Sequence, residues 1–316
     1  MVFQLTILGT SAAVPTPTRF LSGQVLNMRD QLFLIDCGEG TQSRLTQLGI
    51  KKSKINHIFI SHLHGDHVFG LVGVLTSMAM QSRKHLLTLY GPTGLQELVE
   101  TTFRLTYYQS PFPIQCVTVD ADQATELIDN ESFSVKSFPL KHRIPCVGYV
   151  FREKEAERTM KVEKIAEYAI PFTDIKAIKR GADFKNTDHR FPGKGVLIPN
   201  SDLTTPPPSP RSFAYCSDTA FDETIVQHIR GVDLLYHETT FLSEMTTHAE
   251  MTGHSTALQA GQMAHLADVG QLVTGHYSSR YDELNFILDE AKSVFPNTVL
   301  GIDGQTYSVP LVKTPL

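Results

Sequence analysis

The sequence predicts an α/β fold in which two β-sheets pack face to face and are covered by helices. Its first 40 residues have the pattern of a β-meander. Residues 3–8 alternate between apolar and polar, and the apolar runs 25–28 and 32–35 flank Arg29-Asp30 as the arms of a hairpin would. Strand and helix patterns then alternate through both halves of the chain. A meander with strand–helix units in each half is typical of a sheet sandwich with outer helices.

The remaining elements follow from apolar spacing and from turn and cap residues. Strands are predicted at 55–60, 86–90, 133–140, 146–151, 212–216, 232–236 and 272–274. Helices are predicted at 41–48, 68–81, 95–105 and 281–294, with two more that begin after the cap residues Asp222 and Ser255.

Composition excludes several classes of protein. The 316 residues are 41% apolar and 19% charged, which is ordinary for a globular protein and argues against general disorder. A net charge of −5 excludes a uniformly basic nucleic-acid binder but permits a local basic patch. The four cysteines form no Cys-x-x-Cys pair, which indicates reduced thiols. No apolar run reaches the ~18 residues of a membrane span, and the N-terminus lacks a signal-peptide pattern. We therefore expect a cytoplasmic protein without a membrane partner.

A basic stretch interrupts the alternation of strands and helices. Residues 152–194 hold 11 basic and 8 acidic side chains, a net +3, which leaves −8 for the rest of the chain. The stretch has few apolar positions, so we expect one domain over 1–316 with an inserted surface arm at 152–195. An acidic body repels polyanions, whereas a basic arm can supply contacts to phosphate groups. The candidate substrate-binding residues of the arm are Lys179, Arg180, Lys185, Arg190 and Lys194.

The segment Ser61-His62-Leu63-His64-Gly65-Asp66-His67 carries the strongest chemical signal. Neutral imidazole and carboxylate oxygen are good zinc ligands. In extended chain, His62 and His64 point to the same side and can share one ion. Gly65 lets the chain turn, so that Asp66 and His67 can face a second ion. The segment lies between apolar elements, which argues against a solvated histidine cluster or a tag.

Further candidate ligands stand alone, each just after a predicted strand. They are His142, Asp218 and His276. Singly, each is more typical of a cap or of a residue that supports a ligand than of a ligand itself. Together they occupy the strand ends at which open α/β sheets place their ligand sites.

With these residues in view, the chain resembles the metallo-β-lactamase superfamily and, within it, the ribonuclease Z family of tRNA 3′ endonucleases. The resemblance spans nearly the whole chain in family order. Its motifs are residues 8–12, 36–41, 61–67, 90–92, 217–219, 237–241, 253–256 and 274–281. It implies the αββα sandwich of that superfamily, with a protruding arm.

The resemblance also implies residue roles. His62, His64 and His142 would bind one zinc ion, Asp66, His67 and His276 the other, and Asp218 would bridge them. Asp66 would also accept a proton, and His254 would protonate the leaving oxygen or hold phosphate. His237 and Glu238 would orient these groups. The implied reaction removes 3′ trailers from precursor tRNA, leaving a 3′-hydroxyl on the tRNA and a 5′-phosphate on the trailer. A homodimer is implied, in which one subunit's arm holds RNA cut by the other.

Residues 15–20, Pro-Thr-Pro-Thr-Arg-Phe, resemble the family loop that senses nucleotides at the cut, which makes Arg19 a candidate substrate-binding residue. The family pattern has Asn where Phe20 stands here.

Two alternatives remain open. One is a phosphodiesterase or sulfatase of the same fold that acts on small molecules, and the basic arm argues against it. The other is a binding module without metals, against which the complete ligand set argues. A serine hydrolase or a phosphate-cradling protein is disfavoured, because Gly-x-Ser-x-Gly and Gly-x4-Gly-Lys-[Ser/Thr] do not occur.

Overall fold

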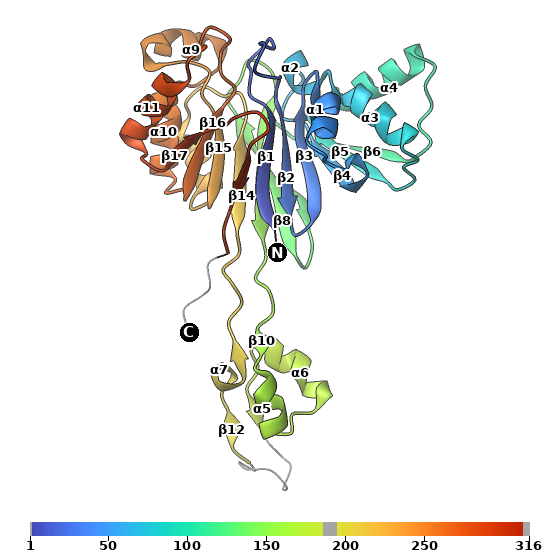
Figure 1. Cartoon of the computed structure of the whole chain (residues 1–316), viewed down its shortest axis with the longest axis vertical. Coiled ribbons are helices and arrows are strands. Elements are labelled where there is room, and N and C mark those ends of the chain that lie inside the picture. Colours follow the sequence, from blue (N-terminus) through green and yellow to red (C-terminus); the bar gives the residue numbers. More distant parts are fainter. Residues whose placement is uncertain (1, 186–194, 312–316) are drawn as a thin grey trace. The chain divides into compact units, whose positions relative to one another are not determined.

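The computed structural model describes residues 2–185 and 195–311 (Figure 1). The chain divides into two compact units. The main unit comprises 1–129, 134–152 and 212–309, and the arm unit comprises 130–133, 153–211 and 310–316. The arm unit thus extends beyond the predicted bounds of 152–195.

Two sheets form the main unit, and each has seven strands within the described residues. The first has the order β18 (Thr306–Ser308), β1 (Phe3–Gly9), β2 (Gly23–Met28), β3 (Gln31–Cys37), β4 (Ile55–Phe59), β5 (Leu87–Gly91) and β6 (Ile114–Thr118). The second has the order β17 (Thr298–Leu300), β16 (Gln271–Gly275), β15 (Leu234–Glu238), β14 (Ser212–Cys216), β9 (Cys146–Glu153), β8 (Phe133–Leu140) and β7 (Thr125–Asp129).

Each sheet combines an antiparallel and a parallel part. In the first, β1, β2 and β3 form the predicted meander, and β3 to β6 run parallel. In the second, β14 to β17 run parallel, and β9 joins β14 antiparallel. Parallel neighbours end at the same edge, so the loops after β4, β14 and β16 can converge on one site.

Aromatic side chains fill the space between the sheets, and helices cover the outer faces. Phe33 and Phe59 of the first sheet lie with ring centroids 5.5 and 5.2 Å from Phe151 of the second. On the first sheet, α1 (Thr41–Gln47), α3 (Leu71–Met80) and α4 (Leu95–Leu105) bury their leucines and valines. On the second, α8 (Val226–Ile229) buries a valine and an isoleucine, and α10 (Ala257–Leu266) buries alanines and a methionine, with α11 (Asn285–Val294) packed against α10 (Figure 1). The predicted α/β sandwich with outer helices is confirmed.

Some predicted elements differ in detail. The helix predicted at 68–81 is two helices, α2 (Gly65–Val68) and α3, separated at Gly70. A Cβ at Gly70 would lie 2.1 Å from the carbonyl oxygen of Gly38, so this close approach requires glycine. Thr256, not Ser255, caps α10, in a capping box with Gln259. Helix α9 (Thr246–Thr252) and the edge strands β6 and β7 were not predicted, and the edge strands are half-exposed with weak alternation.

The arm unit has a small core of its own. Its elements are β10 (Thr159–Met160), α5 (Val162–Glu167), α6 (Phe172–Lys179), β11 (Phe184–Lys185), β12 (Leu197–Ile198), α7 (Asn200–Leu203) and β13 (Thr204–Thr205). Its buried apolar side chains are Ile170, Ile178, Phe184, Ile198 and Leu203. Asn200 links its own helix α7 to the end of α6, because its side-chain amide donates to the carbonyl oxygens of Ile178 (2.6 Å) and Ala182 (2.8 Å).

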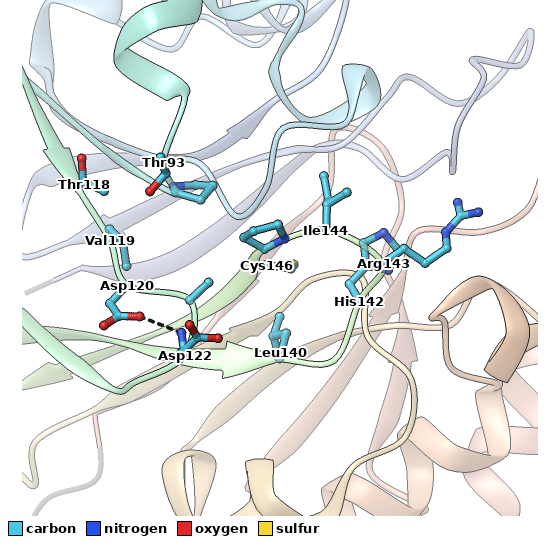
Figure 2. Close-up of a pocket in the computed structure, with 13 residues that line it drawn as sticks. Thr93, Thr118, Val119, Asp120, Asp122, Leu140, His142, Arg143, Ile144 and Cys146 are labelled. Carbon is cyan, nitrogen blue, oxygen red and sulfur yellow. Dashed lines mark hydrogen bonds between the residues drawn. The ribbon is translucent and has the colours of Figure 1, made fainter.

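Three further features bear on the sequence predictions. All four cysteines are free. No helix in the described ranges 2–185 and 195–311 is long and apolar enough to cross a membrane. In the main unit, a hollow of about 620 Å³ opens between the loops after β5 and β6 and the loop that joins β8 to β9, with His142 in its wall (Figure 2).

Candidate metal centre

All seven predicted metal ligands come together at one end of the main unit. His62 and His64 lie in the loop after β4, and Asp66 and His67 lie in α2, which follows directly. The other three each follow a strand of the second sheet: His142 follows β8, Asp218 follows β14 and His276 follows β16. The ligands thus come from both sheets, and the sandwich brings them together.

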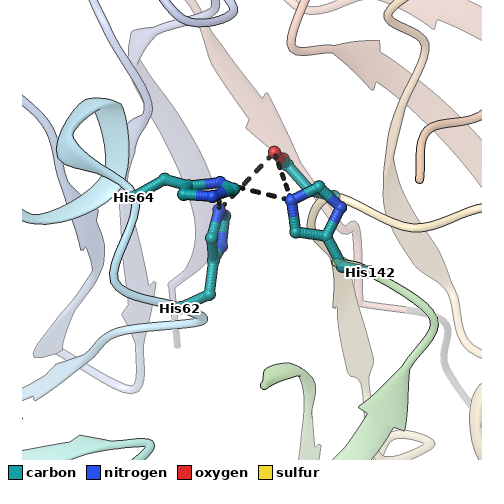
Figure 3. Close-up of side chains that lie close together, drawn as sticks. His62, His64 and His142 are labelled. Atoms are coloured by element: carbon teal, nitrogen blue, oxygen red, sulfur yellow. Dashed lines mark hydrogen bonds and ion pairs between the residues drawn. The ribbon is translucent and has the colours of Figure 1, made fainter. Parts of the chain in front are cut away.

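Three imidazoles and a carboxylate form the first group: His62, His64, His142 and Asp218. His62 Nε2 lies 3.1 Å from His64 Nδ1, which lies 3.2 Å from His142 Nε2 (Figure 3). Burial lowers the pKa of all three imidazoles, which favours the neutral form. Neutral imidazole is the form that binds a metal ion.

The second group consists of Asp66, His67 and His276. His67 Nε2 and His276 Nε2 are 3.2 Å apart, and Asp66 Oδ2 lies 3.6 and 3.4 Å from them. The backbone N–H of Ala13 donates to the same Asp66 oxygen at 2.7 Å and so fixes the carboxylate.

Asp218 lies between the two groups and directs one oxygen towards each. Its Oδ1 is 3.3 Å from both His67 Nε2 and His276 Nε2, whereas its Oδ2 is 3.6 Å from His62 Nε2. Oδ1 is buried and accepts no hydrogen bond from the described residues. A buried acceptor without a donor, facing nitrogen lone pairs, is costly unless a cation lies there. The donor set of imidazoles and carboxylates therefore fits two metal ions that share Asp218.

In four of the ligand histidines, a hydrogen bond also fixes the Nδ1–H group of the ring. The Nδ1–H groups donate as follows: His142 to Gly253 O (2.7 Å), His67 to Asp36 Oδ2 (2.7 Å), His276 to Thr240 Oγ1 (2.9 Å) and His62 to Ser61 Oγ (3.0 Å). Such contacts select the tautomer and leave Nε2 free to bind the ion.

Asp36 is the supporting residue to which sequence analysis gave no role. It is fully buried at the end of β3, with a left-handed φ of 54°. Besides His67, its carboxylate accepts from Ser61 N (2.7 Å), Ser61 Oγ (2.8 Å) and Tyr215 Oη (2.6 Å). Its position in the run Asp36-Cys37-Gly38-Glu39-Gly40, which turns sharply after a strand, was the available signal.

Without ions, the buried charges of the centre compensate one another. Burial raises the pKa of Asp218, but the imidazoles of His276, His67 and His62 outweigh it and hold that pKa well below its usual range. Burial lowers the pKa of His67, but the carboxylates of Asp218, Asp36 and Asp66 raise it well above the ordinary value. The carboxylates and imidazoles of the centre thus favour each other's charged forms, and the carboxylates make the centre favourable for positive charge.

His254 lies beside the centre and is held by Glu238. Its Nδ1–H donates to Glu238 Oε1 at 2.9 Å, and Nδ1 lies 3.9 Å from Asp218 Oδ2. Burial lowers the pKa of His254, but the Glu238 carboxylate outweighs it and raises the pKa to about 9. Glu238 also accepts from Thr240 Oγ1, the partner of His276, so it contacts His254 directly and His276 through Thr240. His237, in contrast, directs its Nδ1–H to the carbonyl oxygen of Glu238.

None of the predicted substrate-binding residues in the described ranges belongs to either ligand group. Arg19 is only 7% exposed, and its guanidinium donates to the carbonyl oxygens of Tyr281 (2.9 Å) and Ser278 (3.4 Å). In the arm unit, Lys179 and Arg180 pair with the carboxylate of Glu157 at 3.0 and 3.1 Å. Lys185 is exposed in β11, and Arg190 and Lys194 fall outside the described residues.

Comparison with known proteins gives a consistent result. The family model described as "Anti-Pycsar protein Apyc1" matches residues 3–146. The protein named ribonuclease Z from Parabacteroides distasonis is 43% identical over 307 residues, which cover 97% of this chain and 99% of that protein. The crystal structure of human tRNase Z, short form, matches with a TM-score of 0.69 at 27% identity and covers 97% of this chain and 99% of its own. The metallo-β-lactamase fold protein YhfI from Bacillus subtilis, at 18% identity and a TM-score of 0.66, shares the fold over 97% of this chain and 99% of its own.

Proposed function

The chain belongs to the ribonuclease Z family, and from this premise we propose that it is an endonuclease that removes 3′ trailers from precursor tRNA. The observation that carries the proposal is the arrangement of seven side chains in two groups that share Asp218. Such paired sites are common in enzymes that hydrolyse phosphodiesters.

We propose that the first group and Asp218 hold one zinc ion, and that the second group and Asp218 hold the other. The Nε2 and Nδ1 atoms that face each other 3.1–3.2 Å apart support this assignment, because imidazole nitrogens lie so close when a cation joins them. When bound, two such ions supply Lewis-acid stabilisation of the phosphoryl oxygens and lower the pKa of a water molecule.

The side chains of the centre then divide the proton transfers between them. The Asp66 carboxylate, which the Ala13 amide fixes through Oδ2, is placed to accept a proton from the attacking water. His254, held by Glu238, is placed to give a proton to the leaving 3′ oxygen. The Glu238 carboxylate raises the pKa of His254 to about 9, so the ring carries the proton that a general acid must give. The products are a 3′-hydroxyl on the tRNA and a 5′-phosphate on the trailer.

The basic residues of the arm are proposed to hold the body of the tRNA. Lys179, Arg180 and Lys185 are described there, and Arg190 and Lys194 complete the set in the sequence. We propose that Arg19 contributes to substrate binding by positioning its own loop, residues 15–20. Its guanidinium holds this loop through hydrogen bonds to the carbonyl oxygens of Tyr281 and Ser278. A homodimer in which the arm of one subunit serves the centre of the other, in the cytoplasm, completes the proposal.

The test is cleavage of a 3′-extended precursor tRNA with both product ends mapped. We expect one cut at the base of the trailer by the wild-type protein and at most a trace with His64→Ala, which lacks a ligand of the first group. Bis(p-nitrophenyl) phosphate serves as the small-diester comparison. A kcat/KM for this diester that equals or exceeds the value for the precursor would contradict the proposal and favour the small-molecule phosphodiesterase. Light scattering at micromolar concentration tests the dimer, and a fully active monomer would contradict it.

A further inference from the structure

The hollow beside His142 borders the candidate metal centre at that residue. One of its lining residues, His142, belongs to the first ligand group, and the next residue, Arg143, also lines it. Its volume of about 620 Å³ lies within the range of small-ligand sites, roughly 300–1,000 Å³. A ligand at the His142 end of this hollow therefore lies beside the first ligand group.

Three apolar residues lie beneath the mainly polar lining of the hollow. Val119, Leu140 and Cys146 are buried in it, with exposed fractions of 2, 8 and 0%. The N–H of Val119 donates to the carbonyl oxygen of Gly91 at 2.8 Å, which holds the loop after β6 against the end of β5. The small apolar part of this lining can contact the face of a nucleobase, which binds by stacking and by exclusion of water.

Charge divides the rim into two ends. Arg143 and His142 lie at one end, and Asp120 and Asp122 lie at the other (Figure 2). The N–H of Asp122 donates to Asp120 Oδ1 at 2.8 Å, which fixes the first carboxylate and leaves its other lone pairs facing the hollow or solvent. Phosphate is attracted to the guanidinium end and repelled by the carboxylate end. A nucleotide in the hollow therefore places its phosphate near His142 and Arg143 and its base near the two aspartates.

The aspartates also select among bases. An ionised carboxylate only accepts hydrogen bonds, so it pairs with an exocyclic amino group. Cytosine presents the N4 amino group on its pairing edge, where uracil presents the O4 carbonyl oxygen. Two acceptors that face each other repel, so the carboxylate end disfavours uracil.

We propose that this hollow is a subsite for one nucleoside next to the scissile phosphate, and that Asp120 and Asp122 select cytosine over uracil there. The inference rests on the proposed function, which supplies the RNA strand. It adds a preference for one base, which the metal-ligating side chains do not provide.

The experiment uses precursor tRNAs that carry cytidine or uridine at each of the two positions flanking the cut. At one of these positions we expect the wild-type protein to cleave the cytidine substrate with a kcat/KM about five- to tenfold higher, the lower part of the range for one specific base contact, because the aspartates are exposed. Asp120→Asn and Asp122→Asn offer an amide donor to uracil O4, so the ratio at that position should fall towards one. Glu97→Gln removes an equal charge from the exposed face of α4 and should keep the wild-type ratio.

A binding measurement separates this inference from the proposed function. Cytidine 5′-monophosphate should bind the zinc-loaded protein several-fold more tightly than uridine 5′-monophosphate, and Asp122→Asn should remove the difference. Equal cleavage of all precursors together with equal binding of the two mononucleotides would overturn the subsite. Preferential binding of the cytidine nucleotide by a protein that cleaves no precursor would overturn the proposed function and support the subsite.

Discussion

Replacing Asp36 by Asn should weaken metal binding although Asp36 is not itself a ligand. Its carboxylate accepts the Nδ1–H of His67 at 2.7 Å, together with three other hydrogen bonds. An asparagine of the same shape keeps one acceptor oxygen and turns an NH₂ group towards donors. The negative charge of Asp36 orients the His67 ring and makes its Nε2 more basic. The asparagine variant loses that charge.

The size of the effect follows from two terms. Loss of the residue that supports a ligand lowers metal affinity by roughly 10- to 100-fold, or about 1.4–2.7 kcal/mol. A buried donor left without an acceptor costs a further ~1–3 kcal/mol of folding free energy. We therefore expect weaker zinc binding by the second group, together with a lower unfolding temperature.

The assay is competition for zinc between the protein and a chelating dye, beside thermal unfolding with and without zinc. Tyr215→Phe is the matched control, because it removes one hydrogen bond to the same Asp36 oxygen and leaves the contact with His67 intact. It should lower the free energy of unfolding by about 1 kcal/mol. It should change zinc affinity by less than about threefold, which is small compared with the roughly 10- to 100-fold loss expected for Asp36→Asn. Wild-type zinc affinity in Asp36→Asn, or an equal loss in Tyr215→Phe, would refute the reasoning.

Two more predictions concern proton transfer and the arm. His254→Ala should keep its zinc and lose turnover by roughly 10²–10⁴-fold, with partial recovery on a substrate that has a better leaving group; loss of zinc instead would make His254 a ligand. Neutralising Lys179 and Arg180 should raise KM for precursor tRNA. It should also lower the slope of log affinity against log salt by somewhat less than one unit for each phosphate that the arm no longer binds. Lys51→Gln, an exposed charge of the main unit, should leave both unchanged, and equal values in all three proteins would remove the arm from substrate binding.

The sequence revealed those parts of the site that are local in the chain or follow a strand. His62 to His67 form one run, and His142, Asp218 and His276 each follow a recognisable apolar strand. Because parallel strands end at the same edge of a sheet, these separate positions lie close together in one site.

Contacts between distant segments were not predictable in the same way. Asp36 reaches His67 through the pairing of β3 with β4, and nothing local in the sequence specifies its four donors. Arg19 stands in a loop that indicates substrate contact, yet its guanidinium bonds to carbonyl oxygens more than 250 residues away in the chain. The interruption between α2 and α3 at Gly70 depends on the close approach of Gly38. The apolar pattern of the helix does not indicate this contact.

The most direct test of the account is a titration of metal-free protein with zinc, with the metal content and the cleavage rate of a precursor tRNA measured on the same samples. The account predicts two zinc ions per chain at saturation and cleavage that appears only as the second ion binds. Full cleavage by chelated protein that holds far less than one ion per chain would contradict it.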